Sequence, residues 1–166
     1  MGREAIELLA YLMDEAFDGN DEHSLLWILR SVGEDGWLWL PPGGGRSVYD
    51  IVRHVGECTY VYESHAFGDG AMRWDRPGTI PPTPPAQDPA GIIGWLRDGH
   101  RRVRESLLAL HDDTELRGLR RANWGQECET RWLLNVLLQH DLYHSGEINH
   151  LRSLQQGTDR WAWQEG

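Results

Sequence analysis

Two histidines in the C-terminal third of the chain, His140 and His144, carry the strongest chemical signal in the sequence. In a helix, a four-residue spacing places two imidazoles about 6 Å apart along the axis and about 40° apart around it. Two imidazoles placed in this way can chelate a divalent metal ion without distorting the backbone. The spacing alone is weak evidence, because paired histidines of this kind often belong to a core that binds no metal.

The surroundings of the pair indicate that it points into the protein. The same helix face is shared or flanked by aliphatic residues: Leu133, Val136, Leu137, Ile148, Leu151 and Leu154. Burying two imidazoles there costs free energy unless something binds them. A third imidazole comes from an earlier segment, where His54 falls within an apolar stripe that includes Ile51 and Val55.

Three inward histidines would leave open positions on a metal for water or substrate. That arrangement is expected of a catalytic metal rather than a structural one. We therefore interpret His54, His140 and His144 as metal ligands.

Other side chains could join or replace these ligands. Cys58 follows His54 by four residues and could add a thiolate, although a free cysteine on an apolar helix face usually belongs to the core. His100 lies near another apolar stripe and is the main rival as the third ligand, and His65 could line a pocket near Cys58. The contribution of Cys58, His65 and His100 to the site stays open at this point.

Two carboxylates are candidates for supporting roles. Glu147 lies about one turn beyond His144, and Glu57 lies about one turn beyond His54. Either side chain could orient a ligand or handle a proton, although exposed carboxylates are more often simply solvated. The segment from His140 to His144 resembles the zincin motif only superficially, because the shorter Asp141 stands where a zincin has glutamate. A protease is therefore not favoured.

Helices must position these residues. Local signals mark where helices start and stop: clusters of helix-breaking residues, the capping pair Ser47 and Asp50, Asp88-Pro89 at a start and Gly157 at an end. They predict the following helical segments: residues 4–17, 22–32, 47–68, 88–110 and 129–157. The first two segments could be a single interrupted helix. No segment has the alternation expected of a strand. Four main helices without a repeat predict an all-α fold, most economically a four-helix bundle.

The connections have their own signals. Residues 69–87 are rich in proline and predict an extended loop, and residues 111–128 predict a polar connection that could include one helical turn. The tail at residues 159–163 contains two tryptophans and is expected to pack back onto the bundle or onto a partner subunit.

Composition narrows the class of protein. The 166 residues carry a net charge of −10, and all 16 basic residues are arginine. An acidic chain argues against nucleic acids and anionic membranes as partners, because both require a concentrated basic face. The lack of lysine excludes Schiff-base and P-loop chemistry. The length fits a single domain over residues 1–166, since domains usually have about 100–200 residues.

Several signals bear on the compartment. The two cysteines, Cys58 and Cys128, are far apart in the chain and form no disulfide framework. Glu7 interrupts any apolar stretch that could act as a signal peptide. The longest apolar stretch, residues 132–138, is too short to span a bilayer. We expect a cytoplasmic protein.

Two stretches together resemble the DinB-like (DinB/YfiT) superfamily of metalloenzymes. The first is residues 46–55, Arg-Ser-Val-Tyr-Asp-Ile-Val-Arg-His-Val, and the second is residues 140–148, His-Asp-Leu-Tyr-His-Ser-Gly-Glu-Ile. The likeness extends from the first helix to about Leu154. Its specificity comes from the two motifs occurring together, in this order, on predicted helices.

The resemblance implies a four-helix bundle of up-down-down-up connectivity with a long crossover, often as a homodimer. It also implies a divalent metal, zinc or nickel, held by three histidines that match His54, His140 and His144. Some branches of the family transfer groups or isomerise substrates with low-molecular-weight thiols such as mycothiol, bacillithiol or glutathione. Many relatives carry glutamine where this chain has Glu147, so the surroundings of the metal differ at that position.

Three hypotheses for the function follow. The first is a metal-dependent enzyme with a small-molecule substrate, acting as a thiol S-transferase, an isomerase or with hydrolase-like activity. The second is a non-enzymatic bundle that binds a metal or small ligand in a stress response, with Cys58 or His65 completing the coordination. The third is a plain structural bundle whose histidines are hydrogen-bonded in the core. We favour the first, because three inward imidazoles leave open metal positions.

Overall fold

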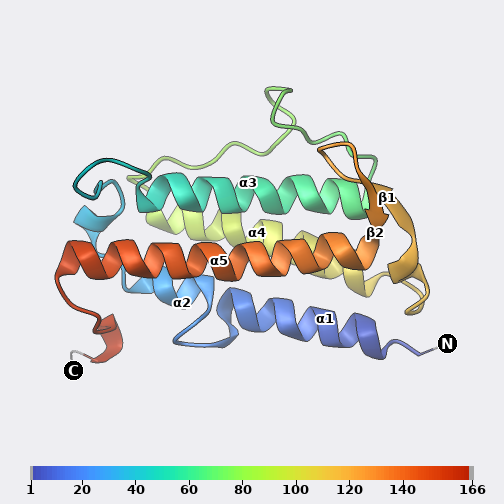
Figure 1. Ribbon diagram of the computed structural model, residues 1–166, viewed down its shortest axis with the longest axis horizontal. Helices are drawn as coiled ribbons and strands as arrows, with labels where there is room; N and C mark the ends of the chain where they lie inside the picture. The colour runs from blue at the N-terminus through green and yellow to red at the C-terminus, as the bar shows by residue number, and fades with distance from the viewer. Residues whose placement is uncertain (1, 165–166) are drawn as a thin grey trace.

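Three long helices and one interrupted helix lie side by side along the long axis of the molecule (Figure 1). The computed structural model describes residues 2–164. Its α-helices are α1 (Glu4–Asp14), α2 (Leu25–Arg30), α3 (Val48–Phe67), α4 (Pro89–Leu108) and α5 (Thr130–Gln156). The predicted all-α four-helix bundle is therefore confirmed.

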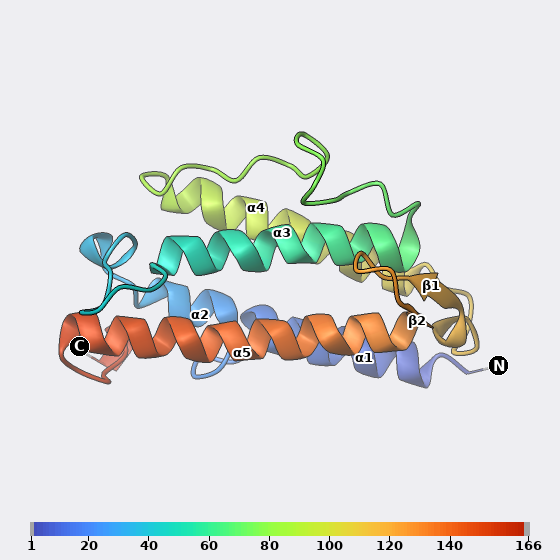
Figure 2. The same cartoon turned by 45° about the horizontal axis from the view of Figure 1, so that its top comes forward.

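The connectivity of the bundle is up-down-down-up. Helices α1 and α2 run in one direction, α3 and α4 both run in the opposite direction, and α5 returns in the first direction (Figures 1 and 2). Parallel α3 and α4 require a connection that travels back along the whole bundle, and residues 69–87 provide it without any helix or strand. Prolines suit this extended segment because they cannot continue a helix.

The interrupted helix resolves a point that the sequence left open. Helix α1 ends in a π-helical turn, Glu15–Gly19, and α2 begins only after Ser24. The two elements are thus separate helices that share one position of the bundle. With its π-helical turn the first runs to Gly19, slightly beyond the predicted end at residue 17, whereas α2 is shorter than the predicted segment 22–32.

The predicted helix boundaries of α3, α4 and α5 rest on local capping. The Ser47 hydroxyl accepts a hydrogen bond from the Asp50 backbone N–H, and the Asp50 carboxylate accepts one from the Ser47 backbone N–H. The Asp88 carboxylate accepts from the Gly91 N–H at the start of α4. Gly157 ends α5 with φ +68°, a left-handed conformation that glycine adopts without steric cost.

The prediction that the chain has no strand was wrong. Strands β1 (Leu119–Arg121) and β2 (Glu127–Glu129) form an antiparallel hairpin within the connection from α4 to α5, after the one helical turn, Glu115–Arg117. Three residues per strand are too few to show an alternating pattern in the sequence. The hairpin depends on its turn instead, where the Ala122 N–H donates to the Gln126 carbonyl.

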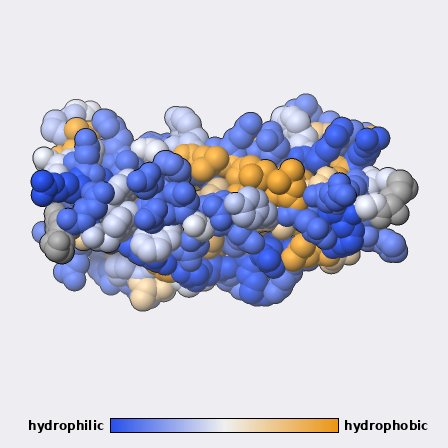
Figure 3. All heavy atoms as spheres, turned by 90° about the horizontal axis from the view of Figure 1, so that it is seen from below, coloured by the Kyte–Doolittle hydropathy of each residue, from blue (hydrophilic) through white to orange (hydrophobic). Residues whose placement is uncertain are grey.

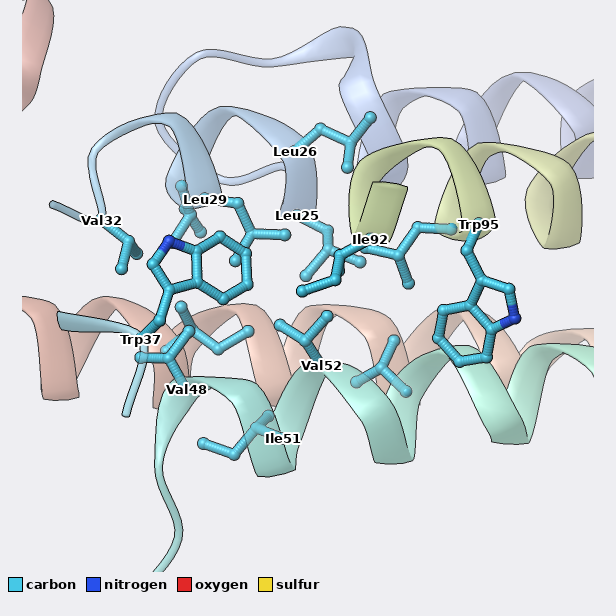
Figure 4. Packing of buried hydrophobic residues seen from close by; sticks show 14 of the residues in the cluster. Leu25, Leu26, Leu29, Val32, Trp37, Val48, Ile51, Val52, Ile92 and Trp95 are labelled. Atoms are coloured by element: carbon cyan, nitrogen blue, oxygen red, sulfur yellow. The ribbon is translucent and has the colours of Figure 1, made fainter. Parts of the chain in front are cut away.

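The largest core cluster joins α2, α3, α4 and α5. Figure 4 shows Leu25, Val52 and Ile92 pointing toward one another, between the indoles of Trp37 and Trp95. All of these side chains are buried. The core therefore fixes the position of α3 relative to the other helices.

The C-terminal tail packs back onto the bundle around a buried arginine. The Arg152 guanidinium donates to the Asn149 side chain and to the carbonyls of Asp159 and Arg160, and it lies 4.6 Å from the centre of the Trp161 ring. These contacts satisfy a charge that would otherwise be costly to bury.

Most of the surface on the side of α1 and α2 is hydrophilic, apart from a strip of hydrophobic side chains (Figure 3). Among the exposed large apolar or aromatic residues of α1 are Leu8, Tyr11 and Leu12. None of the helices within residues 2–164 carries an apolar stretch long enough to cross a bilayer.

We predict opposite effects on stability for two glycine substitutions in the bundle. A methyl group on Gly56 of α3 would lie 1.9 Å from the Trp95 ring, so Gly56→Ala should destabilise the protein by about 1–3 kcal/mol despite its better helix propensity. Gly94 of α4 has no neighbouring atom within 4 Å of such a methyl group, so Gly94→Ala should stabilise by about 0.5–1 kcal/mol. Urea unfolding followed by circular dichroism measures both. Equal effects of the two substitutions would contradict the α3–α4 packing.

Candidate metal centre

Helices α3 and α5 bring three histidines together. They pack against each other along the bundle, with His54 on α3 and both His140 and His144 on α5 (Figure 2). The ring centres lie 4.9 Å apart for His54 and His140, 5.1 Å for His54 and His144, and 4.4 Å for His140 and His144. The structure thus places all three predicted ligands in one cluster.

The closest approach in the cluster joins two ring nitrogens. His54 Nε2 and His140 Nε2 lie 3.0 Å apart, while the buried His140 Nδ1 has no hydrogen-bond partner among the described residues. Cys58 Sγ lies 3.7 Å from His54 Nδ1, and ligand atoms of His54, Cys58 and His140 all lie within 4.8 Å of one another. The compact set of donor atoms is therefore His54, Cys58 and His140, whereas His144 joins the cluster through the proximity of its ring to the other two imidazoles.

A carboxylate and an arginine orient the third imidazole. His144 Nδ1 lies 2.8 Å from the Glu147 carboxylate and donates its proton to it, so Nε2 is the ring nitrogen that remains for a metal. Arg46, in the loop before α3, donates to both oxygens of Glu147 at 2.8 Å. A carboxylate that holds a histidine in this way is typical of the surroundings of a metal ligand.

The electrostatics of the cluster keep imidazoles neutral. Burial, aided by the neighbouring His144 and by Arg46, lowers the pKa of His54. Burial and the two other histidines lower the pKa of His140 to about 4. Neutral imidazole is the form that binds a metal, so both rings are ready to act as ligands at neutral pH.

Glu147, unlike the imidazoles of His54 and His140, keeps its charged form. Burial acts to raise the pKa of Glu147, but the hydrogen bonds from His144 and Arg46 outweigh it and hold this pKa below its ordinary value. The carboxylate therefore stays charged while it orients His144.

Cys58 contributes a protonated thiol in the absence of a metal. Burial, with smaller effects from Asp141 and Glu57, raises the pKa of Cys58 to about 12. Its ligation would require loss of that proton, whereas the neutral imidazoles already present lone pairs. The histidines are thus the better-prepared donors.

Two neighbours of the cluster received no role from the sequence. Asp141 is buried next to His140 in the chain, its Oδ1 has no hydrogen-bond partner among the described residues, and burial raises its pKa to about 7. The signal was present, because Asp141 falls between Leu137 and Ile148 on the buried face of α5. Tyr62 lies with its ring centre 6.2 Å from that of His140, and burial raises its pKa to about 12.

The remaining candidates lie elsewhere. His100, which the sequence offered as an alternative third ligand, stacks on Phe17, and its Nε2 lies 2.8 Å from the Asp14 carboxylate. It therefore links α4 to the first helical segment and is not part of the histidine cluster. Near the other end of α3, His65 contacts the hairpin through the Arg121 carbonyl. Glu57 lines a cavity of about 220 Å³ between α3 and the loop at residues 73–83.

The fold and the histidine cluster agree with a comparison against known protein families. The DinB superfamily matches residues 20–148, a region that includes His54, His140 and His144. The chain belongs to this superfamily. Searches of curated proteins and of solved structures gave no significant match.

The lowered histidine pKa values predict how stability depends on pH in the metal-free protein. The pKa of His140 is about 4 when folded against an ordinary 6.5, so between these values the unfolded chain binds a proton that the folded chain does not. The contribution of His140 to the free energy of unfolding should therefore fall as the pH drops from about 6.5 to about 4, opposite in sign to the contribution of Asp141, and His140→Asn should remove the His140 contribution.

Urea unfolding at a series of pH values measures the effect. His150→Asn is the matched control, because it removes an exposed imidazole from the same helix. An identical pH dependence in the wild type and in His140→Asn would contradict the buried, neutral state of His140.

Proposed function

We propose that the protein is a divalent-metal-dependent enzyme whose metal, zinc or nickel, is held by His54, His140 and His144. The observation that carries the proposal is the convergence of the three imidazoles between α3 and α5, with ring centres 4.4–5.1 Å apart. Imidazole nitrogen is a preferred donor for both metals.

The donor set fits such an ion. Two ring nitrogens in contact at 3.0 Å can share at most one hydrogen bond, and the buried Nδ1 of His140 remains without a partner in residues 2–164. A buried nitrogen without a partner costs about 1–3 kcal/mol, a cost that ligation after a ring rotation would remove. The lowered pKa values of His54 and His140 favour the same neutral state that a metal requires.

A bound divalent metal supplies a Lewis acid that lowers the pKa of a coordinated water or thiol. The side chains of this chain orient and support that chemistry. Glu147 accepts the Nδ1 proton of His144 and fixes the orientation of its ring, while Arg46 holds Glu147 in place. His54 and His140 are only partly buried, so part of each residue faces solvent.

We assign the reaction to the class suggested by the resemblance, transfer or isomerisation of a small molecule with a low-molecular-weight thiol. Three protein ligands support this class, since three-ligand sites leave positions for a thiol or a substrate. The acidic surface and the absence of lysine fit a small-molecule substrate better than a polynucleotide.

Metal binding is the first test of the proposal. The purified protein should contain close to one zinc or nickel ion per chain, and His140→Ala should lose it. Binding should also stabilise the wild type, by about 2.7 kcal/mol at a free metal concentration 100 times Kd. Elemental analysis and thermal unfolding with and without added metal measure these effects.

His150→Ala is the matched control for metal binding, since it removes an exposed histidine from the same helix. Equal metal content in wild type and His140→Ala would refute the three-histidine site.

Turnover is the second test. We expect the wild type to conjugate or isomerise members of an electrophile panel in the presence of glutathione, mycothiol or bacillithiol. His140→Ala should reduce kcat/KM by at least about 100-fold, because the activated nucleophile would be lost. Activity that survives in His140→Ala would exclude metal-dependent catalysis.

A second candidate function is a non-enzymatic metal-binding bundle, and one observation favours it. Cys58 Sγ belongs to the compact set of donor atoms with His54 and His140, so it could complete a closed coordination sphere. Cys58→Ala separates the two functions. A closed site should lose metal affinity in Cys58→Ala, whereas the three-histidine enzyme should keep both its metal and its activity.

A further inference from the structure

A second polar site lies at the far end of α3. A pocket of about 790 Å³ opens between the C-terminus of α3, the residues that follow it and the β1–β2 hairpin. Its lining includes His65, Arg120, Arg121, Asn123 and Trp124. Figure 1 shows the hairpin beside this end of α3, away from the loop that carries Arg46.

Two arginines in this pocket have no partner. Within residues 2–164, the side chains of Arg120 and Arg121 make no hydrogen bond or ion pair, and Nε of Arg120 is buried without an acceptor. The other charged residues of the lining are Asp69 and Arg73, and Arg73 pairs with Asp75. Two neighbouring unpaired guanidinium groups in a concave site favour an oxyanion, which they can bind through paired N–H groups.

Two more polar atoms of the pocket residues are buried without partners. His65 Nδ1 lies 2.7 Å from the Arg121 carbonyl and donates to it, while His65 Nε2 is buried with no partner among the described residues. Asn123 Oδ1 is also buried and has no hydrogen-bond partner among the described residues. Each such group costs about 1–3 kcal/mol when left unsatisfied, which favours a side-chain movement that brings it to a polar partner in the pocket.

We propose that this pocket binds a small molecule that carries a carboxylate or a phosphate. Arg120 and Arg121 bind the oxyanion, and a small movement of the side chains would let the buried Asn123 Oδ1 and His65 Nε2 accept hydrogen bonds from hydroxyl or amine groups next to it. The half-exposed indole of Trp124 offers an apolar wall for the remainder of the ligand.

The pocket is a different site from the histidine cluster. His65 follows His54 by 11 residues on the same helix, a separation of about 16 Å along the axis. The Tyr62 ring stands between them, 6.2 Å from the His140 ring and 6.1 Å from the Trp124 ring. The proposal therefore stands whether or not the cluster holds a metal.

Titration of the full-length protein with inorganic phosphate and with succinate tests the proposal, with chloride as the reference salt. We expect saturable chemical-shift changes in ¹H–¹⁵N spectra, confined to the hairpin backbone, the Trp124 indole and the end of α3. Tighter binding of phosphate would identify a phosphate-bearing ligand, and tighter binding of succinate a carboxylate.

Arginine variants test the assignment of the oxyanion. Arg120→Gln and Arg121→Gln should each weaken binding by about tenfold or more, because each removes a charged hydrogen bond. Arg117→Gln, which removes an exposed arginine outside the pocket, should leave Kd within about twofold. Arg121 is itself exposed, so Arg121→Gln remains informative even where Arg120→Gln affects folding.

His140→Ala separates this proposal from the metal site, since it should bind the same anions with unchanged Kd. The proposed anion site would be overturned by chemical-shift changes that match those caused by chloride. It would also be overturned if Arg120→Gln, Arg121→Gln and the wild type bound the anions equally. Anion binding that disappears in His140→Ala would also overturn it, by placing the anion at the histidine cluster.

Discussion

The contact between α3 and α5 is the interaction on which the site depends. Each helix alone carries an incomplete set of donors, one imidazole on α3 and two on α5, and only their packing brings the rings within 5.1 Å. The buried residues Val52, Ile148 and Leu151 belong to the cluster that joins these helices. Because packed cores resist small displacements, the hydrophobic contact also holds the imidazoles in position.

The polar groups between these helices work against stability. Desolvation disfavours the charged forms of His54, His140 and Asp141, and it acts without a compensating ion pair for Asp141 in the described residues. A protein that used the α3–α5 contact only for folding would gain by filling it with aliphatic side chains. The buried imidazoles are therefore better explained by binding than by structure.

Local signals and distant contacts differ in how well the sequence reveals them. The starts of α3 and α4 and the end of α5 were predictable, because Ser47, Asp88 and Gly157 act on neighbouring backbone groups. The grouping of His54 with His140 was also predictable from helical periodicity. The pairing of Arg46 with Glu147 was not, because it joins residues 101 positions apart that meet only in the folded bundle. The hairpin escaped prediction since its strands are too short to show a period.

Helix α3 links two regions of different electrostatic character. Near its N-terminal half, around His54, α3 lies beside the imidazoles of α5 and the anionic Glu147. Its C-terminal end lies beside the unpaired Arg120 and Arg121. His54 and His65, which mark the two regions, lie about 16 Å apart along α3, about twice the Debye length of about 8 Å at physiological salt. Direct electrostatic coupling between the two regions is therefore weak. Any influence of one on the other has to pass through packing, and Tyr62 is placed to transmit it because its ring contacts both His140 and Trp124.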